Sequence, residues 1–167
     1  MDYFPVFSKD DRYISFYSTR YGRPQLFVRD PVTSQEVLVY DNPYDALNVE
    51  RAVWSGNNKL AFSLGNNVFY SEPFDFHNIK RVNDAVNYES FNDINGRVIG
   101  WFPDNKHILV TEVAENAQKL IKLNTDTNQT ELITTINQGR PFITSAGHLY
   151  ILENRQVYRW NASKGLT

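Results

Sequence analysis

The side chains best suited to acid–base or metal chemistry in this chain are its three histidines. Imidazole titrates near neutral pH and is a common metal ligand. His107 and His148 each lie six residues after an aromatic residue, at the position that Tyr13 holds in an earlier copy of the same pattern, and His77 lies in an expected loop. Because His107 and His148 occupy the same position in two repeats, their presence can be explained without a metal. We therefore predict no metal site and no cofactor.

The carboxylates and possible nucleophiles of the chain do not match any known catalytic motif either. Asp10, Asp11 and Asp104 fall in short polar turns, where aspartate commonly hydrogen-bonds its own backbone. The chain has no cysteine and none of the G-x-S-x-G, phosphate-loop, H-E-x-x-H or EF-hand patterns. Arg20 is expected to pair with a nearby carboxylate or carbonyl. We expect no catalytic residues and predict that the protein is not an enzyme.

The elements that hold these turns recur along the chain. Phe7, Trp54 and Trp101 are spaced 47 residues apart, and each precedes a polar turn and a β-rich run. A weaker fourth copy begins 41 residues later, at Phe142. A period in the forties with this content is typical of stacked or radial β-repeats. We expect all four aromatic side chains to be buried, each packed against a neighbouring repeat.

Each repeat contains several short β-rich runs separated by polar turns, and the first contains four. The sequence therefore predicts an all-β fold: a β-propeller segment of about four four-stranded antiparallel blades, in a single domain over residues 1–167. The propeller is expected to be partial or four-bladed, and the chain ends where the last strand of the fourth blade should begin. The blades are expected at about 3–40, 50–84, 97–135 and 139–167.

Composition and charge support this fold and argue against some partners. Aromatic residues make up 14% of the chain, which favours strands. The 17 basic and 19 acidic residues give a net charge of −2, so neither a basic nucleic-acid surface nor a polybasic membrane patch is indicated. We predict no nucleic-acid contact and no membrane contact by this segment.

Residues 4–30 carry a family resemblance. They begin F-P-V-F-S-K-D-D, end Q-L-F-V-R-D, and resemble the TolB-type, WD-like β-propeller repeat. That repeat runs approximately P-x-W-S-P-D-G-K-x-I-A-F-x-S-x-R-x-G-x-x-Q-I-Y-V-x-D. The second copy lacks the Pro-Asp pair, and Pro103-Asp104 restores it in the third. Such repeats occur in TolB, in the propellers of prolyl-oligopeptidase and tricorn-type proteases, and in CadC-like winged-helix transcription regulators.

The amino-acid sequence of the first repeat most closely resembles the repeats of the CadC-like regulators. That resemblance implies a non-catalytic sensory module in the periplasm, which receives a signal through protein–protein or small-ligand contacts and passes it to a distant DNA-binding domain. One alternative is the substrate-gating propeller of a prolyl-oligopeptidase or tricorn-type protease. Another is a structural interaction scaffold, and a cytoplasmic location remains an alternative to the periplasm.

Two segments that depart from the repeat are candidates for partner contact. The segment 71–78 is longer and more apolar than the matching turns, and it contains Phe74, Phe76 and His77. The connection 41–50 contains Tyr44. Exposed apolar loops are typical of protein interfaces. The alternative is that the two phenylalanines lie beneath the loop and cover the outer edge of the blade.

Strand edges at the two ends of the segment are the last candidates. An unpaired edge invites pairing with another chain. We predict self-association, either as a two-fold arrangement of eight blades or by end-to-end pairing of residues 3–7 with residues 157–160, where Tyr158 lies. A protein partner at these edges is the alternative.

Overall fold

The computed structural model describes residues 1–41, 51–64, 67–82, 96–114, 117–161 and 165–166. These residues form four sheets of four antiparallel strands and contain no helix. The sheets are arranged as a four-blade β-propeller, which confirms the predicted fold class. In each sheet the strands pair in chain order, so every blade is a simple meander.

Blades 1 and 2 comprise the first eight strands. Blade 1 contains β1 (Asp2–Phe7), β2 (Ile14–Ser18), β3 (Gln25–Arg29) and β4 (Glu36–Tyr40). Blade 2 contains β5 (Val53–Trp54), β6 (Leu60–Leu64), β7 (Asn67–Glu72) and β8 (Asp75–Val82).

Blades 3 and 4 follow. Blade 3 contains β9 (Arg97–Trp101), β10 (His107–Ala114), β11 (Ala117–Asn124) and β12 (Thr130–Ile136), and blade 4 contains β13 (Arg140–Ile143), β14 (Leu149–Glu153), β15 (Gln156–Asn161) and β16 (Gly165–Leu166). The last strand of blade 4 begins at the position that the sequence indicated, because Gly165 and Leu166 pair with Asn161 and Trp160.

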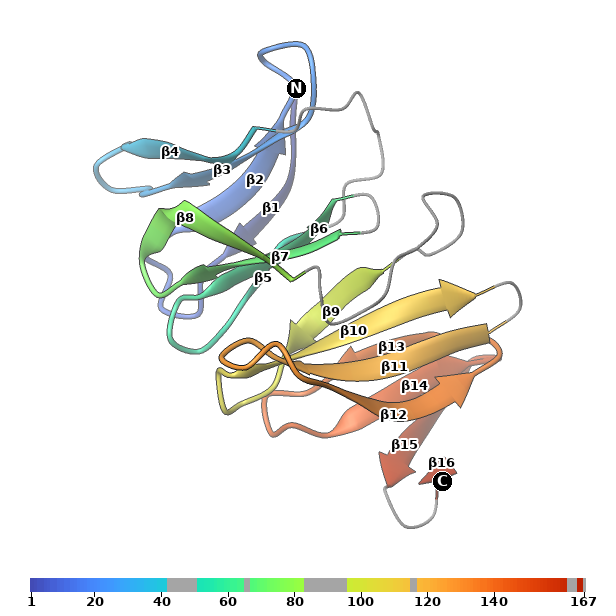
Figure 1. Ribbon diagram of the computed structural model, residues 1–167. Helices are drawn as coiled ribbons and strands as arrows, with labels where there is room; N and C mark the ends of the chain where they lie inside the picture. The colour runs from blue at the N-terminus through green and yellow to red at the C-terminus, as the bar shows by residue number, and fades with distance from the viewer. Residues whose placement is uncertain (42–50, 65–66, 83–95, 115–116, 162–164, 167) are drawn as a thin grey trace.

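The blades follow one another along an arc, with blade 1 at one end and blade 4 at the other (Figure 1). The first strands of the blades lie side by side, because β9 contacts both β5 and β13 and the indole of Trp54 on β5 donates to the carbonyl oxygen of Val6 on β1. We call β1, β5, β9 and β13 the inner strands. Among the described residues, no helix has the length and apolar character that a membrane span requires.

The hydrophobic core lies between successive sheets rather than within one layer. Tyr17, Leu26 and Val28 of blade 1 pack against Trp54 and Phe62 of blade 2. The two further junctions repeat this arrangement, with Val68 and Tyr70 against Ile108, and then Leu109 and Leu120 against Ile151. Each fully buried side chain of this kind contributes about 1.5–3 kcal/mol, so the packing of each blade on the next stabilises the fold.

The repeat aromatics do not share one environment. Trp54 and Trp101 are 4% and 8% exposed, as predicted, but Phe7 is 54% exposed. Val6 packs toward blade 2. Because neighbouring residues of a strand point to opposite faces, Phe7 lies on the face of blade 1 that points away from blade 2. The prediction that Phe7 is buried is therefore wrong.

The fourth copy is displaced by one residue from the predicted alignment. Trp101 pairs with Ile108 and Ile143 pairs with Leu149, so Ile143, not Phe142, holds the repeat position in blade 4. Phe142 points to the other face, stacks on Tyr150 with ring centroids 5.5 Å apart, and is 38% exposed. The prediction that Phe142 is a buried anchor is wrong, because the side-chain alternation turns it away from blade 3.

The turns after the inner strands confirm this corrected alignment. The fourth residue after each repeat position has a left-handed backbone conformation, with φ between 57° and 81°. Asparagine, aspartate and glycine tolerate that conformation best, and these are the residues found there. They are Asp11, Asn58, Asn105 and Gly147.

Candidate functional site

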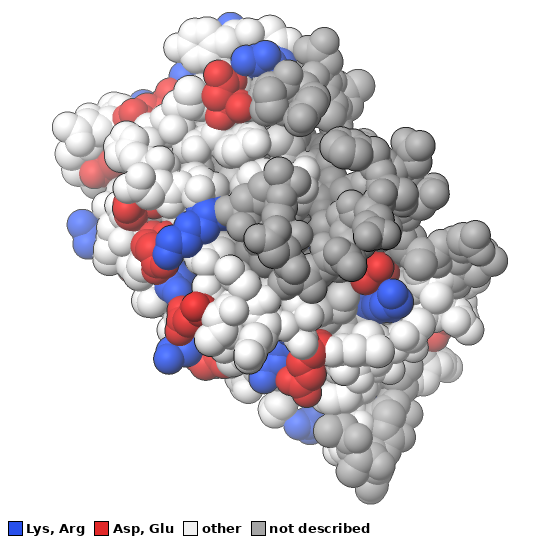
Figure 2. All heavy atoms as spheres, viewed as in Figure 1, with Lys and Arg blue, Asp and Glu red and all other residues white. Residues whose placement is uncertain are grey.

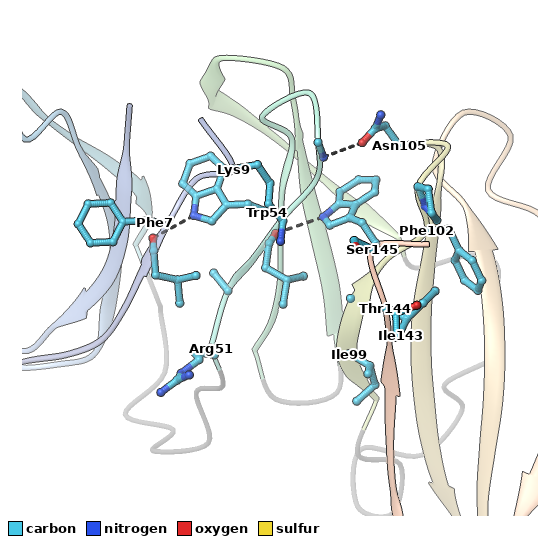
Figure 3. A pocket seen from close by; sticks show the side chains of 17 residues that line it. Phe7, Lys9, Arg51, Trp54, Ile99, Phe102, Asn105, Ile143, Thr144 and Ser145 are labelled. Carbon is cyan, nitrogen blue, oxygen red and sulfur yellow. Dashed lines mark hydrogen bonds between the residues drawn. The ribbon is translucent and has the colours of Figure 1, made fainter. Parts of the chain in front are cut away.

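A groove of about 540 Å³ runs across the inner strands of all four blades. Its walls come from the ends of β1, β5, β9 and β13 and from the turns that follow them (Figure 3). The groove is open to solvent on one side and mixes apolar, polar and cationic side chains. The side chains that distinguish it are Phe7, Lys9, Arg51, Phe102, Asn105, Thr144 and Ser145.

Two indole rings form the fixed part of the wall. The Nε1–H group of Trp54 donates to the carbonyl oxygen of Val6 and to Oγ of Ser15, both at 3.1 Å. The Nε1–H group of Trp101 donates to the carbonyl oxygen of Val53, also at 3.1 Å. Because both indoles are buried and hydrogen-bonded, their role is to join blades and hold the groove in shape.

The charged side chains among the described lining of the groove are all positive. Lys9 and Arg51 are both exposed and line it, and no aspartate or glutamate belongs to its described lining. Figure 3 shows both cations on the side of blades 1 and 2, separated from each other along the direction of the inner strands. On the face in Figure 2, by contrast, basic and acidic side chains are interspersed. The groove is thus suited to an extended ligand that carries negative charge at more than one point.

The predicted turn carboxylates and histidines lie outside this groove. His107 Nδ1 is 2.6 Å from Oδ2 of Asp104, and its Nε2 is 3.2 Å from Nδ2 of Asn124. Burial raises the pKa of Asp104, but hydrogen bonds from the N–H groups of Lys106 and His107 and from the imidazole together hold that pKa below its usual value. His148 packs edge-on against Tyr150. Among the described residues no cluster of three or more metal-ligating side chains occurs.

The segment 71–78 is a tight hairpin rather than the predicted longer loop. Glu72 pairs with Asp75, which leaves Pro73 and Phe74 as the turn. Phe74 has φ of 60°, a conformation that usually requires glycine at this turn position. The outer strand therefore starts at Asp75 instead of Ile79.

The structure places the predicted contact residues of this hairpin in different environments. Phe74 is 51% exposed, and its ring lies 5.6 Å from the guanidinium of Arg12 and 6.1 Å from Tyr13. Phe76 is 5% exposed and packs edge-on against Trp54 and Tyr13. Of the two phenylalanines, only Phe74 has a surface that a partner would reach, and its role in contact stays a prediction.

The remaining predicted contact residues do not join the groove. His77 is exposed, and its N–H group donates to Asp75 at 3.3 Å. Tyr158 is half-buried on β15 and donates to Gln156 at 2.5 Å. Tyr44 lies outside the described residues. Arg20 pairs with Glu36 at 2.5 Å, which confirms its predicted structural role.

Sequence reasoning missed the two groove cations. Lys9 follows Phe7 by two residues, and Arg51 precedes Trp54 by three. The sequence feature that could have indicated them is their position next to an inner strand. In a propeller, residues at that position come close together from every blade. A single charged residue in a polar turn gives no such indication until the four inner strands are placed side by side.

Comparison with known proteins identifies the fold but no close relative. No family model and no curated protein sequence matches the chain. Among solved structures, it is similar to TolB from Acinetobacter baumannii, with a TM-score of 0.69 and 15% identity over 99% of this chain and 42% of that one. It is also similar to an oligogalacturonate lyase in complex with manganese, with a TM-score of 0.71 and 11% identity over 96% and 50% of the two chains.

A prolyl endopeptidase structure is similar as well, with a TM-score of 0.64 and 12% identity over 99% of this chain and 27% of that one. The chain therefore has a TolB-like β-propeller fold. It spans about half the length, or less, of these three solved chains. Because TolB and enzymes share the fold, the fold itself neither assigns nor excludes catalysis.

Proposed function

We propose that this chain is a non-catalytic β-propeller binding module whose inner-strand groove takes an extended acidic segment of a partner protein. The observation that carries the proposal is the pair of exposed cations, Lys9 and Arg51, in a groove whose described lining contains no carboxylate. The absence of a nucleophile–base motif in the sequence supports the non-catalytic part of the proposal.

A protein segment suits the groove better than a compact small molecule. The groove is open and crosses four strands, and its two cations are separated along the direction of the inner strands (Figure 3). Phe102 supplies apolar surface beside polar groups such as Thr144 (Figure 3). An extended peptide presents charges and apolar side chains along its length in this alternating manner.

As the biological setting, we propose the periplasmic sensory domain of a CadC-like transcription regulator. The resemblance of residues 4–30 to the repeats of that group supports this setting. In it, occupation of the groove would be the signal that a distant winged helix reports. The full-length gene tests the setting directly: a winged helix and one transmembrane span upstream would support it.

A second candidate is the gating propeller of a serine peptidase, which the similarity to the prolyl endopeptidase structure favours. In that case the full-length gene encodes a hydrolase domain beside the propeller. Assays of this isolated chain for peptidase and esterase activity are expected to give none under either candidate. Activity that survives repurification and scales with the chain would overturn the non-catalytic proposal.

The binding proposal is tested with two labelled peptides that differ only in charge. One alternates glutamate with leucine, and the other has glutamine in place of glutamate. In fluorescence anisotropy titrations the acidic peptide is expected to bind about tenfold more tightly, with an affinity that falls as salt is raised. Lys9→Glu combined with Arg51→Glu should abolish the preference.

Arg155→Glu is the matched control, because Arg155 is exposed but does not line the groove. Its effect on peptide affinity should be small. Equal affinity of the wild-type chain for both peptides, or equal losses in the groove and control variants, would overturn the proposed site. Absence of binding to either peptide would favour the alternative of a structural scaffold.

A further inference from the structure

Asn105 is a half-buried residue of the groove whose backbone is fixed by its turn. It is the fourth residue after Trp101 and has φ of 57°, a left-handed conformation that asparagine tolerates. Its N–H group donates to the carbonyl oxygen of Phe102 at 3.1 Å. The side chain therefore leaves the turn of blade 3 from a fixed position at the rim of the groove.

The orientation of the Asn105 carboxamide is set by its partner in blade 2. Oδ1 accepts from the N–H group of Gly56 at 2.6 Å. A backbone N–H group donates and does not accept, so the oxygen end of the carboxamide faces Gly56 and the nitrogen end faces away from it (Figure 3). Among the described residues, none accepts a hydrogen bond from Nδ2. Both N–H groups of Nδ2 are thus left to donate to a ligand.

Two hydroxyl groups of blade 4 are available as donors in the same way. Oγ1 of Thr144 accepts from the N–H group of His148 at 3.1 Å, which leaves its own proton to donate. Ser145 is exposed, and no described residue is hydrogen-bonded to its side chain. Figure 3 shows Asn105, Thr144 and Ser145 on the side of blades 3 and 4. That side of the groove carries neutral donors, whereas the two cations lie on the side of blades 1 and 2.

The equivalent asparagine of blade 2 has a different role. Asn58 is buried, donates through Nδ2 to Oδ2 of Asp10 at 2.7 Å, and does not line the groove. Its amide nitrogen is therefore used within the fold. Of the four left-handed turn residues that follow the inner strands, Asn105 is the one that lines the groove.

We propose that Asn105 is a specificity-determining residue of the groove, an inference that rests on the proposed binding of an acidic segment. Nδ2 of Asn105 donates to a carboxylate oxygen of the ligand on the side of blade 3. Lys9 and Arg51 attract negative charge on the side of blades 1 and 2. A hydrogen bond to a carboxylate is roughly twice as strong as one to a neutral amide oxygen, so Asn105 favours glutamate over glutamine in the ligand.

Asn105→Asp tests this role, because it turns the donor into an acceptor with little change of shape. The variant keeps an oxygen for the N–H group of Gly56, and aspartate tolerates the left-handed conformation, so the chain is expected to fold. The new oxygen repels glutamate but can accept from a glutamine amide. In anisotropy titrations with the two peptides described above, the acidic peptide should bind about tenfold more weakly than to wild type. The glutamine peptide should keep its affinity, and urea titration checks the fold.

Asn57→Asp is the matched control for the added charge. Asn57 is exposed beside Gly56 and does not line the groove. Its Oδ1 accepts from Oγ of Ser55 at 2.7 Å, an interaction that aspartate retains. At physiological salt, which screens exposed charges, this variant should weaken binding of the acidic peptide less than about twofold. Equal losses in Asn57→Asp and Asn105→Asp would reflect the general field of a charge and would overturn the role of Asn105.

The side-chain amide signals of Asn105 give a readout that a purely structural role would not change. In nitrogen–proton correlation spectra, these signals are identified by their loss in Asn105→Asp. They should shift when the acidic peptide is added to wild type, and shift much less with the glutamine peptide.

Two kinds of failure are distinguishable in these experiments. Amide signals that stay in place while the acidic peptide binds, or an Asn105→Asp variant that keeps the wild-type preference, would overturn the role of Asn105 and leave the proposed groove intact. Equal binding of both peptides to wild type, or binding of neither, would overturn the groove itself and the role of Asn105 with it.

Discussion

Asn58 donates through Nδ2 to Oδ2 of Asp10 at 2.7 Å across the junction of blades 1 and 2. The other carboxylate oxygen of Asp10 accepts from Oγ of Ser8 at 2.7 Å and from the N–H group of Arg12 at 3.2 Å. One carboxylate therefore closes its own turn and holds the next blade. This double use gives an exposed turn aspartate a structural role.

The first prediction concerns pH. The hydroxyl of Ser8, followed by Asn58 and backbone N–H groups, holds the pKa of Asp10 below its usual value. A carboxyl whose pKa is lower in the folded state stabilises the fold above its unfolded pKa of about 4, and that contribution is lost as pH falls through the folded pKa. Asp10→Asn should therefore lower the free energy of unfolding at neutral pH but have less effect under acid conditions.

Urea titrations of wild type and Asp10→Asn at pH 7, 5, 4 and 3 measure this difference. Glu131→Gln on β12 is the control for loss of a surface carboxylate, since Glu131 is exposed. A gap between wild type and Asp10→Asn that stays constant from pH 7 to pH 3 would contradict the ionic role of Asp10.

The second prediction concerns the indole at the junction of blades 2 and 3. Trp101 is buried and donates to the Val53 carbonyl oxygen. Trp101→Ala should lower the free energy of unfolding by about 3–5 kcal/mol through lost burial and a cavity. Trp101→Phe, which keeps a ring but removes the donor, should cost less. Phe142→Ala is the comparison, and its partial exposure should limit the loss; a near-zero effect of Trp101→Ala in denaturant titration would contradict this account.

The repeat could be predicted from the sequence, but the residue alignment of its fourth copy could not. The 47-residue spacing of Phe7, Trp54 and Trp101 identified equivalent positions correctly, because residue type and turn chemistry are local features. In the fourth copy the aromatic residue Phe142 suggests the repeat position, but that position belongs to Ile143. The left-handed residue Gly147, four residues after Ile143, shows the correct alignment. Residue type alone does not say which face of a strand a side chain occupies; the register does.

The burial of the repeat aromatics and the lining of the groove depend on how neighbouring blades pack together. The sequence of a single repeat does not contain that information. Phe7 matches Trp54 in sequence, but it is exposed because its face of blade 1 points away from blade 2. Lys9 and Arg51 come from different blades and line one groove only when the inner strands lie side by side. The hairpin at Phe74 was missed because an aromatic residue stands where a tight turn usually requires glycine.

The third prediction tests the close approach between blades 3 and 4. A Cβ at Gly100 would lie 2.8 Å from Cγ2 of Ile143, so one of the two strands must shift. Gly100→Ala should cost about 1–3 kcal/mol of unfolding free energy, as overpacking does in cores. Ile143→Ala removes the methyl group that causes the clash, so adding Gly100→Ala to it should cost much less. Strictly additive losses in this double-mutant cycle would show that the two residues do not touch.

The last prediction concerns the turn residue Phe74. Its φ of 60° is unfavourable for a side chain with a Cβ and much less so for asparagine. Phe74→Asn should therefore raise the free energy of unfolding by about 0.5–1 kcal/mol, although it removes the ring contacts with Arg12 and Tyr13. Phe74→Ala is the control, because it loses the same ring while keeping the unfavourable conformation, and it should not stabilise. Thermal and urea unfolding of the three chains measure the order. If Phe74→Asn is less stable than wild type, the ring contacts outweigh the backbone strain, and Phe74 belongs to the core of the hairpin rather than to a surface held for a partner.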